Sequence, residues 1–250
     1  MVSVTTRISK VKQPRGGYIN PRDLSAVELT DGIHLHPEEN IHATLVGLAV
    51  DYLTRFTLGT SLEEAFTISL RGARNVKELD YAMDLISGIN GLDNNSIENA
   101  CQLVGFDVAF RNSLAAYTPV QSIQPDHFTI SNIRTMVERV IVFSKKYGPI
   151  IKDGFTFEGG YNQTITTGDG DFLTETGLWD LKVSKSGPTN KHTLQLLVYY
   201  LLGLRSIHNE FDNIKELGVF NPRLNKVYVI PIKDIPSDII AEVASEVIGN

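Results

Sequence analysis

The spacing of apolar residues changes after Tyr147, and this change limits the folds that are open to the chain. From His36 to Tyr147, apolar residues recur every three or four positions, as they do on one face of an α-helix. After Gly148-Pro149, short segments such as Phe155–Phe157 and Thr164–Thr167 alternate in the manner of β-strands. A chain that combines both periods is expected to fold as a mixed α/β protein, in which a central mixed sheet is flanked by helices.

The first long helix is expected to begin at His36-Pro37, because proline is favoured in a first turn and acids are favoured near the positive end of the helix dipole. It ends before Gly59. Further helices are predicted over Glu63–Arg74, Val76–Ile89, Ser96–Phe110, Asp126–Tyr147, Lys191–Leu204 and Ile235–Ile248, and further strands over Asp171–Thr174, Leu178–Val183 and Val227–Ile232. A turn at Glu175-Thr176-Gly177 joins the first two of these strands as a hairpin.

Three regions follow from this order of elements. Residues 1–35 have no clear periodicity and are predicted to form a partly ordered N-terminal arm. Residues 36–125 are predicted to form a helical region, made of an early core helix and a helical insertion. Residues 126–250 are predicted to form the core that contains the sheet.

The composition is that of a globular protein without a membrane span. Hydrophobic residues make up 42% of the chain and charged residues 21%. No apolar run approaches the ~20 residues that cross a bilayer, and the N-terminus lacks a signal-peptide pattern, so a cytoplasmic location is expected. The single cysteine, Cys101, excludes an internal disulfide. The net charge of −6 gives no support to nucleic-acid binding by bulk electrostatics, so any phosphate-binding surface has to be local.

Charged side chains are concentrated in the predicted hairpin. Residues two apart in a strand point to the same face, so Asp180 and Lys182 emerge side by side while Leu181 enters the opposite, apolar face. Asp171 opens the partner strand, where its carboxylate can meet that of Asp180. Asp169 competes with Asp171 for this position, but Asp171 better fits the acid that opens the strand. The sequence therefore predicts two carboxylates and a lysine at one edge of a sheet.

Two neighbouring carboxylates in such a hairpin repel each other, and partial burial strengthens the repulsion. A divalent cation removes the conflict. Mg²⁺ prefers oxygen ligands, often takes only one or two carboxylates, and fills its octahedron with waters and phosphate oxygens. A lysine beside it can orient or deprotonate an attacking water and offset charge on a phosphate. Without a cation, the same residues would form a solvated hairpin edge with an incidental ion pair.

The helix that follows the hairpin carries Gln195 and Tyr199 in the spacing Q-x-x-x-Y. An acid at a strand start, D-x-K on the next strand and Q-x-x-x-Y on the next helix resemble the PD-(D/E)xK nuclease superfamily, in particular its RecB-like branch. The resemblance covers roughly residues 155–204, about a fifth of the chain. It implies a restriction-endonuclease-like core in which Gln195 and Tyr199 position the substrate strand or support the site.

The same resemblance implies a metal centre. Asp171 and Asp180 would be metal ligands, with the backbone carbonyl of Leu181 as a third, and Lys182 would be the catalytic lysine. The cofactor would be Mg²⁺, for which Mn²⁺ would substitute.

A weaker similarity lies upstream. RecB-like nucleases carry G-x-x-x-H on an early helix, and Gly47 is followed at this spacing by Asp51 in the position of the histidine. Aspartate can ligate Mg²⁺, so Asp51 would complete the metal site; a solvent-facing acid on an amphipathic helix is the equal alternative. Glu138, on the helix before the sheet, is the rival for this extra acid.

Other polar residues have weaker signals. Four basic residues near the hairpin are candidates for phosphate contacts, although such residues are usually solvated surface charges: Lys185, Lys191, His192 and Arg223. The histidines His34, His36 and His42 have no cysteines or fourth ligand at zinc spacing, and we expect them at a helix start.

These residues together predict a Mg²⁺-dependent nuclease that hydrolyses phosphodiester bonds, with DNA favoured over RNA because the resembling family acts mostly on DNA. The alternative is a catalytically inactive nucleic-acid-binding or assembly protein that retains the nuclease fold. A metal-dependent hydrolase of small phosphate esters is a remote third. Nucleic acid is the expected partner, no membrane partner is expected, and protein partners or a homo-oligomer stay open.

Overall fold

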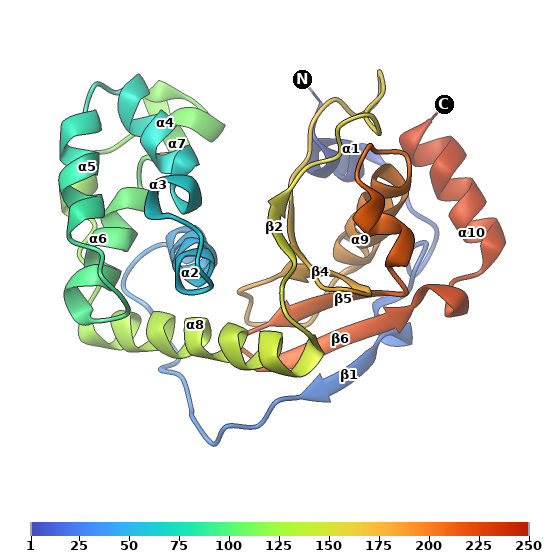
Figure 1. Ribbon diagram of the computed structural model, residues 1–250, viewed down its shortest axis with the longest axis horizontal. Coiled ribbons are helices and arrows are strands. Elements are labelled where there is room, and N and C mark those ends of the chain that lie inside the picture. Colours follow the sequence, from blue (N-terminus) through green and yellow to red (C-terminus); the bar gives the residue numbers. More distant parts are fainter. Residues whose placement is uncertain (1, 250) are drawn as a thin grey trace. The chain divides into compact units, whose positions relative to one another are not determined.

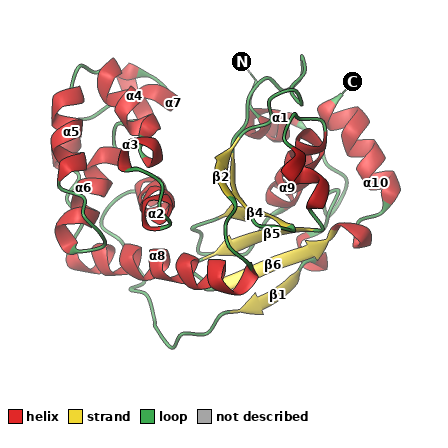
Figure 2. Ribbon diagram, in the orientation of Figure 1, coloured by secondary structure: helices red, strands yellow, loops and turns green. Residues whose placement is uncertain are grey.

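The computed structural model describes residues 2–249, and the chain divides into two compact units. The sheet unit comprises Met1–Thr30 and Phe143–Asn250, and the helical unit comprises Asp31–Val142. Within the described residues there are ten α-helices and one mixed, open sheet of six strands (Figure 2). The chain is thus a mixed α/β protein with a largely helical N-terminal half, which confirms the coarse fold class predicted from the two periodicities.

The six strands belong to the sheet unit and lie in the order β1–β6–β5–β4–β3–β2 (Figure 1). All neighbours are antiparallel except β4 and β5, which run parallel. Their bounds are β1 Ser25–Glu28, β2 Lys152–Phe155, β3 Gly170–Leu173, β4 Gly177–Leu181, β5 Glu216–Asn221 and β6 Lys226–Pro231. The predicted hairpin is confirmed: β3 and β4 pair with Phe172 opposite Trp179.

Helices cover both faces of this sheet. α9 (Asn190–Leu204) connects the parallel strands β4 and β5 and packs on them, and α1 (Val4–Lys10) packs on α9. On the face of Trp179, the ring of Phe143 near the end of α8 (His127–Tyr147) lies 5.0 Å from the Trp179 ring and 4.6 Å from that of Phe220. Successive side chains of a strand point to opposite faces, so Asp180 points away from this aromatic cluster and towards α9.

The helical unit is a bundle of short helices with its own core. Its elements are α2 Ala43–Thr57, α3 Leu62–Ala65, α4 Thr67–Asn75, α5 Leu79–Ser87, α6 Asn94–Val104, α7 Asp107–Arg111 and α8 up to Val142. One carboxylate is buried inside it: Asp107 accepts hydrogen bonds from Tyr52 Oη at 2.7 Å and Ser69 Oγ at 2.5 Å. A buried charge needs such partners, and this one joins α2, α4 and α7.

Helix α1, a 3₁₀ turn (Pro21–Asp23) and strand β1 occur in residues 1–35, where the sequence predicts an arm without clear periodicity. In α1, the buried residues Val4 and Ile8 face the sheet-unit core, and β1 pairs with β6, with Ser25 opposite Val229. These 30 or so residues are therefore part of the sheet unit. α1 and β1 are too short to show a period of their own, and contacts distant in the sequence hold them in place.

Other differences concern the limits of elements. The first long helix begins at Ala43 and not at His36, because the backbone of His36 is held in an irregular conformation by hydrogen bonds with Asn132. Residues 164–167, predicted as a strand, contribute only an isolated bridge between Thr167 and Ser3. The predicted terminal helix is divided into α10 (Ser237–Glu242) and a π-helix, Val243–Ile248.

Strand β5 is the largest omission from the sequence prediction. It lies in the centre of the sheet, yet its residues include Gly218, which normally weakens a strand. A Cβ at Gly218 would collide with the indole of Trp179 on the neighbouring strand β4. The glycine therefore makes room for the largest side chain of the core.

None of the helices formed by residues 2–249 has the length and apolar character needed to traverse a bilayer.

Candidate metal and phosphate site

The candidate site begins with an ion pair at the end of β4, between the buried Asp180 and the partly exposed Lys182. Asp180 is only 2% exposed, and the amine of Lys182 lies 2.8 Å from its Oδ1 and 2.7 Å from its Oδ2. The alternation of the strand brings both side chains to one face, as the sequence predicts, and Lys182 retains 27% exposure at the solvent side of the pair. The lysine is thus tied to the carboxylate and still within reach of a ligand.

Helix α9 adds an amide and a phenol to this pair. Gln195 Nε2 donates to Asp180 Oδ1 at 3.3 Å and to the hydroxyl of Tyr199 at 2.8 Å. Residues four apart lie one above the other on a helix, so Q-x-x-x-Y presents both groups to β4. Both side chains are buried. The structure thus brings together Asp180, Lys182, Gln195 and Tyr199, all of which the sequence analysis singled out.

Asp171 reaches the site from β3. Its Oδ2 accepts the backbone N–H of Leu181 at 2.6 Å. Because Phe172 faces Trp179 in the antiparallel pair, the next position in this register sets Asp171 opposite Asp180, and opposite residues point to the same face. The two predicted acids therefore share one face of the hairpin.

The donor set fits a hard divalent cation. Asp180 Oδ2 is buried and has no hydrogen-bond partner of its own, although the Lys182 amine is close enough for an ion pair. Among residues 2–249, no group of three or more His, Cys, Asp and Glu residues is arranged to hold a metal. A site with two carboxylates suits Mg²⁺, which keeps several waters, better than Zn²⁺, which takes three or four protein ligands.

The charges of the site act on Tyr199. Burial raises the pKa of Tyr199 well above its usual value, and the nearby carboxylates of Asp180 and Asp171 raise it further. The phenol therefore stays protonated at neutral pH. It can act as a hydrogen-bond donor or acceptor at the site, but not as a general base.

His192 also belongs to the surroundings of the ion pair. It lies one turn before Gln195 on α9, and its Nδ1 accepts the backbone N–H of Thr189 at 3.2 Å. Burial lowers the pKa of His192, and the positive charge of Lys182 lowers it further. The neutral ring therefore carries its proton on Nε2, which makes it a hydrogen-bond donor.

One residue of the site region was missed in the sequence. Asn221, at the end of β5 and buried, donates from Nδ2 to the carbonyls of Ser184 at 2.8 Å and Ser186 at 3.1 Å. It fixes the loop that follows Lys182. A polar residue at the end of a strand could have indicated Asn221. The sequence analysis did not identify it, because strand β5 itself was not predicted.

No protein-family model, curated protein or solved structure matches this chain. Any proposal about the function of this protein therefore rests on the arrangement of its side chains.

Asp51 lies on α2 in the helical unit, where Arg55 Nε and Nη2 donate to its two carboxylate oxygens at 3.0 and 3.1 Å. The arginine one turn later thus engages the whole carboxylate. The role of Asp51 as a metal ligand stays a prediction. Its rival Glu138 is exposed on α8, also in the helical unit.

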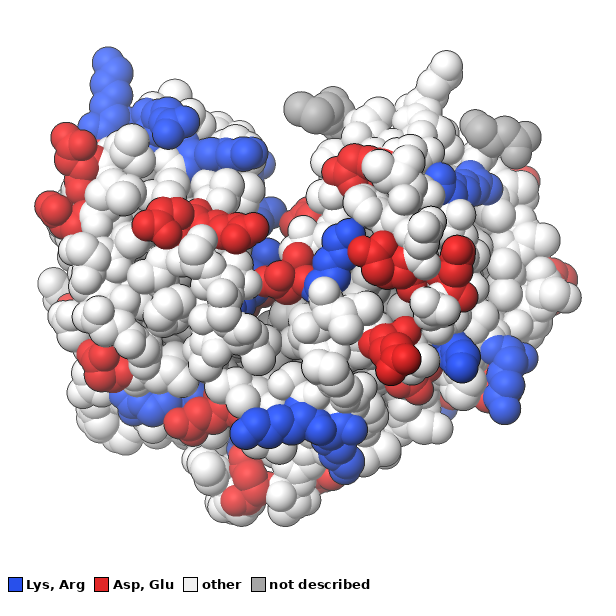
Figure 3. Space-filling view, viewed as in Figure 1, with Lys and Arg blue, Asp and Glu red and all other residues white. Residues whose placement is uncertain are grey.

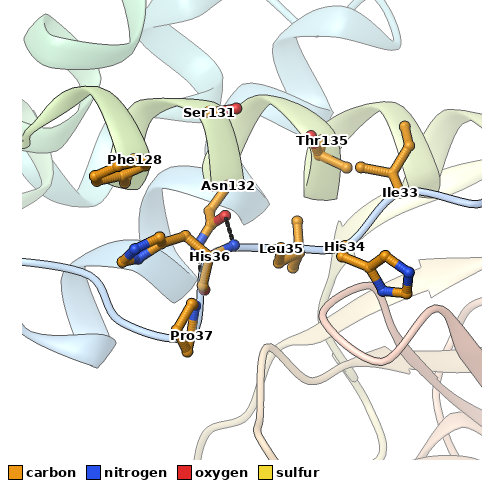
Figure 4. A pocket seen from close by; sticks show the side chains of 9 residues that line it. All are labelled: Ile33, His34, Leu35, His36, Pro37, Phe128, Ser131, Asn132 and Thr135. Carbon is orange, nitrogen blue, oxygen red and sulfur yellow. Dashed lines mark hydrogen bonds between the residues drawn. The ribbon is translucent and has the colours of Figure 1, made fainter.

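The remaining candidates are scattered. Lys185 and Lys191 are exposed, and Arg223 is partly exposed in the turn after β5. His36 stacks on Phe128 with ring centroids 4.0 Å apart, and both residues line a pocket of about 370 Å³ (Figure 4). In that view the ring of His34 lies apart from that of His36. His42 caps α2 by accepting the N–H of Thr44 at 3.2 Å.

Proposed function

We propose that this protein is a metal-dependent nuclease that hydrolyses phosphodiester bonds, most readily in DNA. The observation that carries the proposal is the buried carboxylate of Asp180, which holds the Lys182 amine at 2.7–2.8 Å beside a second acid, Asp171. Burial of an acid next to another acid costs free energy unless cations are near. Such an arrangement is costly for a purely structural strand and useful for binding a phosphate through a metal.

The finer fold is part of this proposal. A mixed sheet flanked by helices, with the acids and lysine on a central hairpin and the Q-x-x-x-Y helix directly after it, supports a restriction-endonuclease-like core of the RecB-like type.

Each side chain has a role that follows from its contacts. Asp171 and Asp180 would hold Mg²⁺, with the carbonyl of Leu181 as a third ligand. The metal, when bound, would supply charge that offsets the phosphate and a water of lowered pKa. Lys182 is positively charged and partly exposed, so it can orient a water or neutralise a non-bridging phosphate oxygen. Gln195 fixes one oxygen of Asp180 and thereby sets the orientation of the carboxylate.

A second candidate, a nucleic-acid-binding protein without catalytic activity, is favoured by one observation. Both oxygens of Asp180 lie within 2.8 Å of the Lys182 amine, so the lysine offsets the carboxylate even without a metal. The net charge of −6 agrees equally with either candidate when the phosphate-binding surface is local.

Cleavage assays separate the two. Wild type, Lys182→Ala and the control Lys233→Ala, at an exposed lysine of the sheet unit outside the site, would be incubated with labelled single- and double-stranded DNA in Mg²⁺, in Mn²⁺ and in EDTA. The nuclease proposal requires metal-dependent cleavage by the wild type. The activity should be retained in Lys233→Ala and fall by at least about 10²-fold in Lys182→Ala. Absence of metal-dependent cleavage by the wild type on every substrate would favour the binding protein.

A further inference from the structure

The helical unit carries a second group of residues with a chemistry of its own. Helices α4 and α7 pack closely: a Cβ on Gly72 would collide with the carbonyl of Phe106, and Asn75 Nδ2 donates to the carbonyl of Ala109 at 3.2 Å. The contact brings the exposed side of α4 next to the exposed end of α7. Side chains from the two helices therefore form one continuous surface.

Basic side chains dominate that surface. Arg71 and Arg74 are exposed on α4, three residues apart and hence on the same side of the helix. Lys77 follows one turn later, and the partly exposed Arg111 ends α7. Figure 3 shows Lys and Arg gathered over the end of the helical unit where Figure 1 labels α4 and α7. We call Arg71, Arg74, Lys77, Arg111 and the neighbouring Phe110 the basic face.

Acids are absent from the segments that build the basic face. Residues 65–77 and 108–125 contain no Asp or Glu, and their only charged residues are the four cations of the face. The nearest acid in α7, Asp107, is 2% exposed, and it offsets part of the charge of Arg111 at 3.3 Å. On a chain with a net charge of −6, this is the kind of local positive surface that a polyanion requires.

An exposed aromatic ring lies among these cations. Phe110 is 43% exposed, and the guanidinium of Arg71 lies 5.6 Å from the centroid of its ring. An exposed phenylalanine beside arginines provides what an unpaired nucleobase stacks on, while the arginines contact the adjoining phosphates. Bases inside a duplex are stacked on each other and do not offer a free face to such a ring.

We propose that the basic face of the helical unit binds single-stranded nucleic acid, with phosphates on its arginines and lysine and a base stacked on Phe110. The choice of nucleic acid as the polyanion rests on the proposed nuclease function. Binding itself is measurable without cleavage, so the two proposals fail separately.

The test measures binding in EDTA, where a metal-dependent nuclease is silent. The full-length chain is titrated against a fluorescein-labelled oligothymidine of about 20 nucleotides, and anisotropy gives Kd over a range of salt concentrations. The double variant Arg71→Glu/Arg74→Glu is compared with Lys10→Glu/Lys12→Glu, which makes the same change in net charge at two exposed lysines of the sheet unit. We expect at least a tenfold weaker Kd for the first and less than a twofold change for the second.

Salt dependence gives a second readout of the same contacts. Loss of two phosphate contacts lowers the slope of log Kd against log salt by about 1.4 for a single strand. All four side chains are exposed, so thermal unfolding curves should match the wild type and verify that the variants fold. Equal losses in both double variants would mean that only net charge matters and would overturn the proposal.

Stacking is tested with Phe110→Ala. We expect about a tenfold weaker Kd for oligothymidine and less than a twofold change for a duplex of the same length, because only the unpaired base uses the ring. Phe110→Leu keeps apolar bulk without the flat ring and should behave like Phe110→Ala. Unchanged oligothymidine binding by Phe110→Ala overturns the stacking role. A wild type that binds no oligonucleotide at low salt overturns the whole proposal and favours a protein partner for this face; metal-dependent cleavage would still be decided by its own assay.

Discussion

Asp171 Oδ2 accepts the backbone N–H of Leu181 at 2.6 Å, so a side chain of β3 is fastened to the main chain of β4 in the middle of the candidate site. The bond fixes the direction of the Asp171 carboxylate. The Asp180 carboxylate is oriented by side chains, the Lys182 amine at 2.7–2.8 Å and Gln195 Nε2 at 3.3 Å. The two carboxylates are therefore held by different means, and substitutions should separate their contributions.

Substitution of Asp171 should distinguish its hydrogen bond from its charge. Asp171→Ala removes the acceptor of the Leu181 N–H and should lower the free energy of unfolding by ~1 kcal/mol, whereas Asp171→Asn keeps an acceptor and should cost less. Both variants should lose metal-dependent cleavage, because the charge is gone in both. Urea unfolding gives the free energies. Full cleavage activity in Asp171→Asn would show that the carboxylate charge has no role.

Removal of the Lys182 amine should destabilise the protein in the absence of divalent metal. Asp180 would keep a buried carboxylate without its cation, at a cost of ~1–3 kcal/mol, towards the low end because Lys182 is partly exposed. Lys182→Met is the informative variant because it keeps the aliphatic bulk. Lys185→Met, at an exposed position three residues on, is the control. Equal unfolding free energies for Lys182→Met and the wild type would argue against a strong pair.

Magnesium should stabilise the folded protein. A ligand at one hundred times its Kd adds ~2.7 kcal/mol if it binds only the folded state, so Tm should rise with Mg²⁺ concentration at constant ionic strength. Asp180→Asn halves the charge of the acid pair and should abolish most of this rise. Sodium chloride of matched ionic strength serves as the control. A wild-type Tm that ignores Mg²⁺ up to millimolar concentrations would contradict the metal site.

The hydrogen bond between Gln195 and Tyr199 should have a modest, separable effect. Tyr199→Phe removes the acceptor of the Gln195 Nε2 donor at 2.8 Å and should cost ~1 kcal/mol of stability. Cleavage should fall further than stability alone explains, because Gln195 also fixes Asp180. Tyr200→Phe, on the half-buried side of α9, should leave cleavage unchanged. Equal cleavage rates in the two variants would remove Tyr199 from the site.

Asp107 should give the helical unit a pH-dependent stability. Burial raises the pKa of Asp107, against the opposing effects of its hydrogen bonds and of Arg111. A raised folded-state pKa means that the contribution of this group to stability is greatest below the unfolded pKa of ~3.9 and decreases as the pH rises through the folded pKa. Asp107→Asn should flatten this part of the curve. Urea unfolding at several pH values measures it; identical slopes for the variant and the wild type would contradict the prediction.

The sequence predicted the hairpin and its neighbours well because their signals are local. Alternation within β4 sets Asp180 and Lys182 on one face, and helical spacing sets Gln195 and Tyr199 on one side of α9. Neither inference needs any knowledge of distant contacts. The same is true of the turn between β3 and β4.

The features that the sequence did not predict depend on contacts between residues that are distant in the sequence. β5 contains Gly218 because Trp179 of another strand fills the space of a side chain, and α2 starts late because Asn132 of α8 holds the backbone of His36. The basic face had a readable signal, the acid-free segments 65–77 and 108–125, but only the packing of α4 on α7 joins them.

Strand β1 has a consequence for how the chain reaches its native state. Ser25, near the start of the chain, pairs with Val229, near its end, and the whole helical unit intervenes between them. Contacts this remote are slow to form, because the entropy of closing a very long loop must be overcome first. Until β1 pairs with β6, one edge of β6 has backbone N–H and C=O groups without hydrogen-bond partners. This exposed edge makes the partly folded protein prone to self-association. Refolding yields should therefore fall with protein concentration, most steeply for variants that weaken the pairing of β1.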